Sequence, residues 1–192
     1  LLLYFRMLFM MAVSLYTSRV VLNALGVEDF GIYNVVGGVV AMFSMLSGSL
    51  SAAITRFITY ELGKGNQENL KKIFSSSVTI QIGLAILIIV VAEAIGVWFL
   101  NMKMNIPDVR ITAANWVFQF SILTFAVNLI SVPYNASIIA HERMSAFAYI
   151  SILEAIGKLA IVFLIVISPM DKLIFYAILM CAVALIVRLA YG

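Results

Sequence analysis

IFSSSVTIQIGLAILIIVVAEAIGVWFL, residues 73–100, is the stretch that decides the fold of this chain. Glu93 is the only acidic or basic residue in it. At about 1.5 Å of rise per residue, a helix of this length covers the roughly 30 Å of a bilayer's hydrocarbon core. The apolar residues form a continuous run instead of the two-residue alternation of a barrel strand. The stretch therefore predicts a helix that spans a membrane.

Similar apolar stretches fill the rest of the chain, and only short polar turns separate them. We expect six transmembrane helices, at residues 1–25, 30–58, 73–100, 111–140, 144–167 and 173–192. Of the 192 residues, 64% are hydrophobic and 11% are charged, so water is not the main solvent of the folded chain. The expected fold is all-α: a polytopic membrane protein in which residues 1–192 form a single lobe of six helices.

The turn between the first two predicted helices has clear helix-end residues. Gly26 is suited to the left-handed conformation that ends a helix, and Asp29 is suited to capping the next helix. Together they predict a tight hairpin. No turn in the chain is long enough to hold a folded soluble domain.

Basic residues in the turns predict the orientation of the chain. One end of the predicted bundle has five of them, namely Arg56, Lys64, Lys71, Lys72 and Arg143. The opposite end has three, namely Lys103, Arg110 and Lys172. Because cytoplasmic turns carry the excess of Lys and Arg, we expect a cytoplasmic N-terminus and an external turn at Gly26.

The composition speaks against several classes of function. The net charge of +3 is small and the basic residues are scattered among helix ends, so we expect no nucleic-acid partner. His141 is the only histidine and the acidic residues are dispersed, so we expect neither a metal nor a cofactor. No nucleophile has a partnered base, and no two carboxylates are placed for acid and base chemistry. We therefore do not expect an enzyme.

Ionisable residues inside the apolar stretches are the candidate functional residues, because a charge at the bilayer centre costs at least about 2.5–3.5 kcal/mol. Glu154 and Lys158 lie four residues apart in the fifth predicted helix, in the order that favours an ion pair. Such a pair is either a self-neutralising structural feature or a pair that opens to bind substrate or a coupling proton.

Three other candidates come from the first, second and third predicted helices. Arg19 and Glu93 lie at similar depth and are a possible contact, although Arg19 is also placed to snorkel to the headgroups. Arg56 lies near the inner end of its helix, where a positive-inside anchor is the alternative. With Lys158, the two arginines predict an interior that attracts an anion. Pro133 should bend the fourth helix, either for packing or as a functional hinge.

Segments of the chain resemble a known family. LGVEDFGIY at residues 25–33, TRF at 55–57 and ELG at 61–63 look like the start of bacterial polysaccharide flippases. These are the O-antigen (Wzx-type) transporters of the multidrug/oligosaccharidyl-lipid/polysaccharide exporter superfamily, whose fold is MATE-like. SVPYNASIIAHE at residues 131–142 is similar to the fourth-helix region of lipopolysaccharide biosynthesis members of that group. The likeness covers essentially all of the chain.

The resemblance implies twelve to fourteen helices in two six-helix lobes, around a cavity that opens to each membrane face in turn. This chain begins at Leu1 and stops inside its sixth apolar stretch, so we expect a fragment, the first lobe, whose partner is a C-terminal lobe of the same protein. Arg19 and Arg56 match basic sites in the first two helices of such proteins. Glu93 and Glu154 are candidate ion-coupling residues, because intramembrane carboxylates often relay protons.

The function that the resemblance implies is the flipping of undecaprenyl-pyrophosphate-linked oligosaccharide across the bacterial inner membrane, for O-antigen or lipopolysaccharide synthesis. A cation-coupled multidrug exporter of the same superfamily is the alternative, but it would favour an acidic, aromatic cavity. A membrane-bound glycosyltransferase or polymerase would need a large external loop, which the short turns do not provide. A non-transporting structural membrane subunit is the third alternative, and its interior charges would all be paired.

Overall fold

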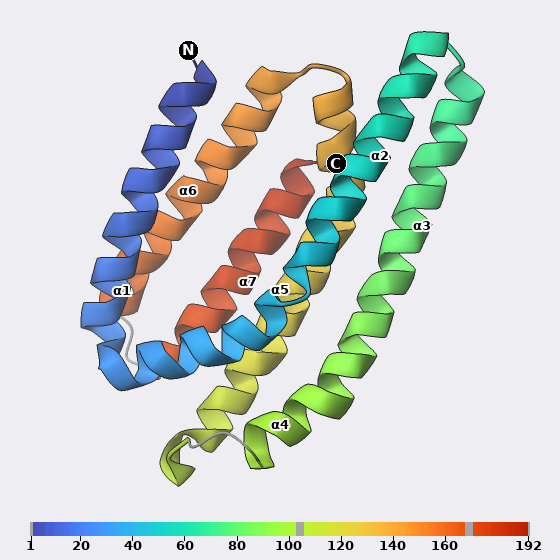
Figure 1. Ribbon diagram of the computed structural model, residues 1–192. Coiled ribbons are helices and arrows are strands. Elements are labelled where there is room, and N and C mark those ends of the chain that lie inside the picture. Colours follow the sequence, from blue (N-terminus) through green and yellow to red (C-terminus); the bar gives the residue numbers. More distant parts are fainter. Residues whose placement is uncertain (1, 103–105, 168–170, 192) are drawn as a thin grey trace.

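The computed structural model describes residues 2–102, 106–167 and 171–191, and every regular element within them is a helix. Figure 1 shows the bundle that they form. The elements are α1 (Leu2–Ala41), α2 (Ser44–Lys64), α3 (Gln67–Val91), the π-helix η1 (Ala92–Gly96), α4 (Val97–Met102), α5 (Asp108–Ala140), α6 (Met144–Ile167) and α7 (Lys172–Ala190). The predicted helix ends at Leu1 and Gly192 lie outside the described residues.

The chain crosses the bundle alternately in one direction and the other (Figure 1). The N-terminus, the turn from α2 to α3 and the turn from α5 to α6 lie at one end. A kink in α1 at Gly26 and the starts of α5 and α7 lie at the other, which we call the Gly26 end. Within the described residues, five segments are long and apolar enough to cross a membrane, namely Arg6–Ala41, Gln67–Leu100, Val109–Ala140, Met144–Ile167 and Lys172–Ala190. The chain is an all-α, multi-pass membrane protein, as predicted.

The sequence predicts a tight hairpin at Gly26, and the structure has instead a kink inside α1 at this residue. Gly26 has φ 82° and ψ 167°, so the backbone leaves the helical conformation at this residue. The two parts of α1, before and after Gly26, run in different directions in Figure 1. Asp29, predicted as a helix cap, instead forms an ion pair with Arg110.

The prediction of one continuous helix over residues 30–58 is wrong. The helix is interrupted at Met42 and Phe43, so its first part belongs to α1 and its second part to α2. At the interruption the Phe43 amide donates to the Val40 carbonyl, a bond one residue shorter than the α-helical one. Gly37 and Gly38 precede this point, and glycine pairs are a common cause of helix kinks.

The predicted helix at residues 73–100 begins earlier and ends later, because α3, η1 and α4 follow one another without a break from residue 67 to residue 102. Asn66 caps its start by accepting a hydrogen bond from the Asn69 amide at 3.1 Å. Gly65, with φ 69°, closes α2 just before it. The other predicted helices agree with α5, α6 and α7 to within a few residues.

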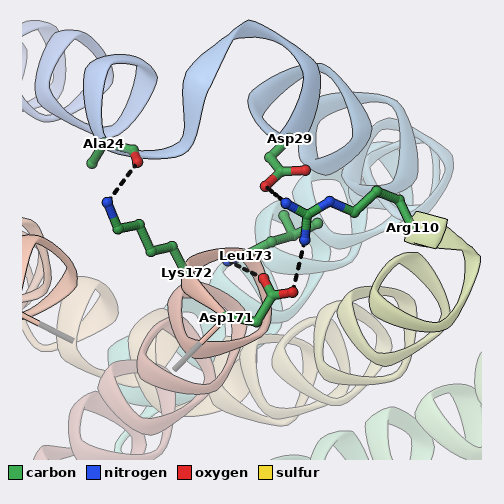
Figure 2. Close-up of polar contacts among 6 residues, drawn as sticks. All are labelled: Ala24, Asp29, Arg110, Asp171, Lys172 and Leu173. Carbon is green, nitrogen blue, oxygen red and sulfur yellow. Dashed lines mark hydrogen bonds and ion pairs between the residues drawn. The ribbon is translucent and has the colours of Figure 1, made fainter. Parts of the chain in front are cut away.

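An ionic cluster ties the helices together at the Gly26 end (Figure 2). The guanidinium of Arg110 lies between two carboxylates, 3.0 Å from Asp29 Oδ2 and 2.7 Å from Asp171 Oδ2. Beside it, Lys172 Nζ donates to the Ala24 carbonyl at 3.3 Å. We call Asp29, Arg110 and Asp171 the end cluster. It joins α1, the start of α5 and the start of α7.

Candidate functional site

The polar interior of the bundle lies between α1, α5, α6 and α7, where three open cavities adjoin. The α1 cavity, of about 450 Å³, is lined by Met10, Met11, Val13, Ser14, Thr17, Ser18, Ala155, Lys158, Tyr176 and Met180. The ion-pair cavity, of about 90 Å³, is lined by Thr124, Asn128, Glu154, Lys158, Met180, Val183, Ala184 and Val187. The α5 cavity, of about 180 Å³, is lined by Tyr33, Gly37, Val40, Ala41, Ser121, Thr124, Phe125, Asn128, Ala177 and Met180.

Lys158 and Glu154 are the charged pair of this interior. Lys158 Nζ donates to Glu154 Oε1 at 2.7 Å, so the ion pair that the four-residue spacing predicts is present. The lysine and glutamate side chains are 34% and 37% exposed, and the lysine lines both the α1 cavity and the ion-pair cavity. An ammonium group has three donors, and the hydrogen bond to Glu154 uses one of them, so Lys158 has donors for another acceptor.

Hydroxyl groups from α1 face the same space. Ser14, Thr17 and Ser18 line the α1 cavity because residues three and four apart share one face of a helix. The Thr17 hydroxyl oxygen is buried and makes no hydrogen bond within the described part of the chain. The phenol of Tyr176 lines the opposite side of this cavity, from α7. The cavity therefore combines one cation with several neutral hydrogen-bonding groups.

The structure does not bring the three predicted cations together. Arg19 and Arg56 are exposed, line none of the three interior cavities and form no ion pair among the described residues. Successive helical residues are about 100° apart, so the face that turns Ser18 toward the α1 cavity turns Arg19 away. In α2, Ile54, Ile58 and Glu61 are buried among the described residues, and Arg56 lies on another face.

Glu93 does not contact Arg19, and the predicted pair between them is wrong. Glu93 lies in η1, and its Oε2 accepts a hydrogen bond from Gln119 Nε2 of α5 at 3.1 Å. This pairing follows from packing, because η1 lies against α5 at the close contact of Gly96 with the Phe118 ring. The sequence places Glu93 and Arg19 at similar depth, but depth does not say which helices are neighbours.

Pro133 is fully buried inside α5, which continues through it as a single helix to Ala140. Next to it, the ring of Tyr134 packs edge-to-face on Phe74 with centroids 5.2 Å apart. The guanidinium of Arg188 lies 3.8 Å from the centroid of the Tyr134 ring. A hinge at Pro133 remains a prediction.

The end cluster was not among the residues predicted from the sequence. Asp29 was predicted as a cap and Arg110 as an orientation signal, although both charges flank turns at the same end of the predicted bundle. That shared end was the available signal, because charges of opposite sign in neighbouring turns are placed to pair. Arg6, whose guanidinium lies 4.2 Å from the centroid of the Phe147 ring, was also not among the predicted residues.

Comparison with known proteins gives one match. A family model described as "Polysaccharide biosynthesis protein" matches residues 4–192. No curated protein and no solved structure matches the chain.

Proposed function

The chain belongs to the polysaccharide biosynthesis protein family, and from this we propose that it is the first lobe of a flippase for lipid-linked oligosaccharide. The family is one of membrane exporters and not of enzymes. The proposed substrate is an undecaprenyl-pyrophosphate-linked oligosaccharide, carried from the cytoplasmic to the outer leaflet of a bacterial inner membrane. A C-terminal lobe would complete the carrier, and the N-terminus would be cytoplasmic.

The observation that carries this proposal is the pair of Lys158 and Glu154 inside an apolar helix. Charged residues within a membrane span are costly and usually mark a pathway for substrate or ions. Here the cation also lines an open cavity whose other polar groups are hydroxyls. Such a set of donors suits a phosphate group, which is anionic and accepts several hydrogen bonds.

In the proposed mechanism the pyrophosphate takes Glu154's place on Lys158. Glu154, released from the ammonium, then takes up a proton, which removes the repulsion between its carboxylate and the bound pyrophosphate. Loss of the proton restores the ion pair and releases the substrate. Arg19 and Arg56, exposed on this lobe, would bind anionic substrate from the side that faces the second lobe. Glu93 is a second candidate for ion coupling, with Gln119 as its resting partner.

A multidrug exporter is the second candidate, and the cavity argues against it. Organic cations are bound by carboxylates and aromatic faces, whereas the only carboxylate lining the three interior cavities is already paired with a lysine. A structural subunit would tolerate loss of this pair.

Complementation of a flippase-deficient strain tests the proposal, with the full-length protein carrying each change. Lys158→Met should lower surface polysaccharide about tenfold or more, because a hydrogen bond to a charged group contributes about 1.5–3 kcal/mol. Lys158→Arg, which keeps the charge, should retain most of the activity. Lys72→Met is the matched control, since Lys72 forms a similar 2.7 Å pair with Glu68 on the exposed surface. Normal polysaccharide with Lys158→Met at normal protein level would reject the proposal.

A further inference from the structure

Two cavities adjoin where α2, α3 and the last part of α5 meet. The groove cavity, of about 180 Å³, is lined by Ile58, Leu70, Lys71, Phe74 and Ser137. The turn cavity, of about 220 Å³, is lined by Ser137, Ile138, His141 and Arg143. Ser137 lines both, so the two spaces meet at this residue. They share no lining residue with the three interior cavities and belong to a separate part of the bundle.

The lining changes from apolar to basic toward the N-terminal end of the bundle, where the turns from α2 to α3 and from α5 to α6 lie (Figure 1). Arg143 and His141 lie in the second of these turns, and Lys71 lies one turn inside α3. Phe74 lies about one turn deeper along α3, and Ile58 lies well inside α2. A phospholipid in a bilayer has the same order, with its phosphate at the surface and its acyl chains below.

The backbone at the end of α5 directs Arg143 back toward the turn cavity. Glu142 has φ 57°, a left-handed conformation that is uncommon for residues other than glycine. The Arg143 amide then donates to the Ile138 carbonyl at 3.1 Å, and the Glu142 amide donates to the Ile139 carbonyl at 3.0 Å. This is the Schellman pattern of a helix C-terminus. It keeps Arg143 beside the last turn of α5, while Glu142 lines neither cavity.

The two cations at these cavities are available to an anion. Lys71 and Arg143 are exposed, and neither forms an ion pair within the described part of the chain. Lys72, the next residue after Lys71, is different, because its ammonium lies 2.7 Å from Glu68 Oε1. Lys72 also lines neither cavity. The unpaired positive charge therefore lies where the hollow is.

We propose that the two cavities bind one anionic phospholipid of the surrounding bilayer. Its phosphate lies at the turn cavity and accepts charge-assisted hydrogen bonds from Lys71 and Arg143. The first part of one acyl chain lies in the groove cavity against Ile58, Leu70 and Phe74. Basic pockets between helices on the cytoplasmic side suit anionic headgroups, and the basic turns predict that this end is cytoplasmic. The bound lipid joins α2 and α3 to the end of α5, and its binding does not depend on the proposed transport function.

Native mass spectrometry of the purified full-length protein tests the site by measuring bound lipid. The anionic probe is dioleoylphosphatidylglycerol, and dioleoylphosphatidylcholine is the comparison with the same chains and no net charge. Phosphatidylglycerol should bind roughly tenfold more tightly. Lys71→Gln and Arg143→Gln should each lower its affinity about fivefold, which is the usual contribution of one basic residue near an anionic lipid surface. Lys72→Gln is the matched control, because it removes the same charge at the adjacent residue and should leave the affinity unchanged.

Ser137→Leu separates a defined site from a general attraction of this end for anions. It fills the point where the cavities meet and leaves every charge in place, so it should also lower the affinity for phosphatidylglycerol several-fold. Thermal unfolding in detergent without lipid should be the same for the wild type and for Lys71→Gln, which shows that lost binding is not lost folding. Equal losses with Lys71→Gln and Lys72→Gln, or full binding with Ser137→Leu, would overturn the proposal. Displacement of the lipid by millimolar inorganic phosphate would also overturn it, because the site would then bind free anions.

Discussion

At the scale of single residues, Gly26 has a backbone conformation that is essentially restricted to glycine. We predict that Gly26→Ala lowers the free energy of unfolding by about 1–3 kcal/mol, because a residue with a Cβ is strained at φ 82° and ψ 167°. The site has open space around it, so the cost would come from the backbone alone. Thermal unfolding of the purified protein in detergent measures the change.

Gly31→Ala is the control for this prediction. Gly31 also has open space around it, but its φ is not positive and it lies within the second part of α1. Alanine should stabilise that helix by roughly 0.5–1 kcal/mol or leave it unchanged. If both alanine variants unfold at the same temperature, Gly26 is not strained in the way the dihedral angles indicate.

The residue scale also shows what the sequence could and could not predict about the site. The Glu154–Lys158 pair was predictable, because i and i+4 positions are neighbours on any helix. The end cluster was predictable only in part: its charges flank turns at the same end of the predicted bundle, but Arg110 and Asp171 are 61 residues apart and pair only once the helices pack. The predicted pair of Arg19 and Glu93 was wrong for the same reason. The sequence indicates the depth of each residue in the membrane, but it does not indicate which helices are neighbours.

At the scale of elements, the π-helix η1 packs closely on α5 at Gly96, which has the least room for a side chain among the described glycines. A Cβ added to Gly96 would lie 2.2 Å from Phe118 Cζ. Phe118 is only 1% exposed and lies in the largest buried cluster, so its ring has little room to move. Glycine at this position is therefore what lets η1 and α5 approach.

We predict that Gly96→Ala lowers the free energy of unfolding by about 1–3 kcal/mol, the usual cost of overpacking a core. The change should also disturb the Glu93–Gln119 hydrogen bond, since Glu93 lies in the same π-helix. Gly83→Ala, earlier in the same span and with open space around it, is the control and should be neutral or slightly stabilising. The same unfolding assay compares them, and equal stability of both variants would contradict the packing argument.

At the scale of elements, the presence of helices was predictable from the sequence, but the breaks within them were not. Long apolar runs must be helical in a bilayer, because every backbone polar group needs a partner there. The break at Met42–Phe43 and the π-turn at Ala92–Gly96 keep most of those bonds and occur inside apolar sequence. The hydrophobic pattern alone therefore does not predict either irregularity.

At the scale of the whole molecule, successive helices cross the bundle in opposite directions, so the turns lie at its two ends. Lys64, Lys71, Lys72 and Arg143 lie at or near the N-terminal end of the bundle, and Arg110 and Lys172 lie at the Gly26 end. Of these, Arg110 is neutralised by the end cluster and Lys172 is bound to the Ala24 carbonyl. Among the described residues, both of these basic residues at the Gly26 end are therefore engaged within the protein; Lys103, counted at that end in the sequence prediction, lies outside the described residues.

The larger number of Lys and Arg in the turns at the N-terminal end predicts that this end is cytoplasmic, since Lys and Arg in short turns are retained on the cytoplasmic side. Single cysteines at two exposed positions, Val27→Cys and Gln67→Cys, test it in the Cys181→Ala background. In intact spheroplasts, an impermeant maleimide should label the cysteine at position 27 and reach the one at position 67 only after the membrane is opened. The reverse pattern would place the Gly26 end in the cytoplasm and contradict the orientation that the basic residues predict.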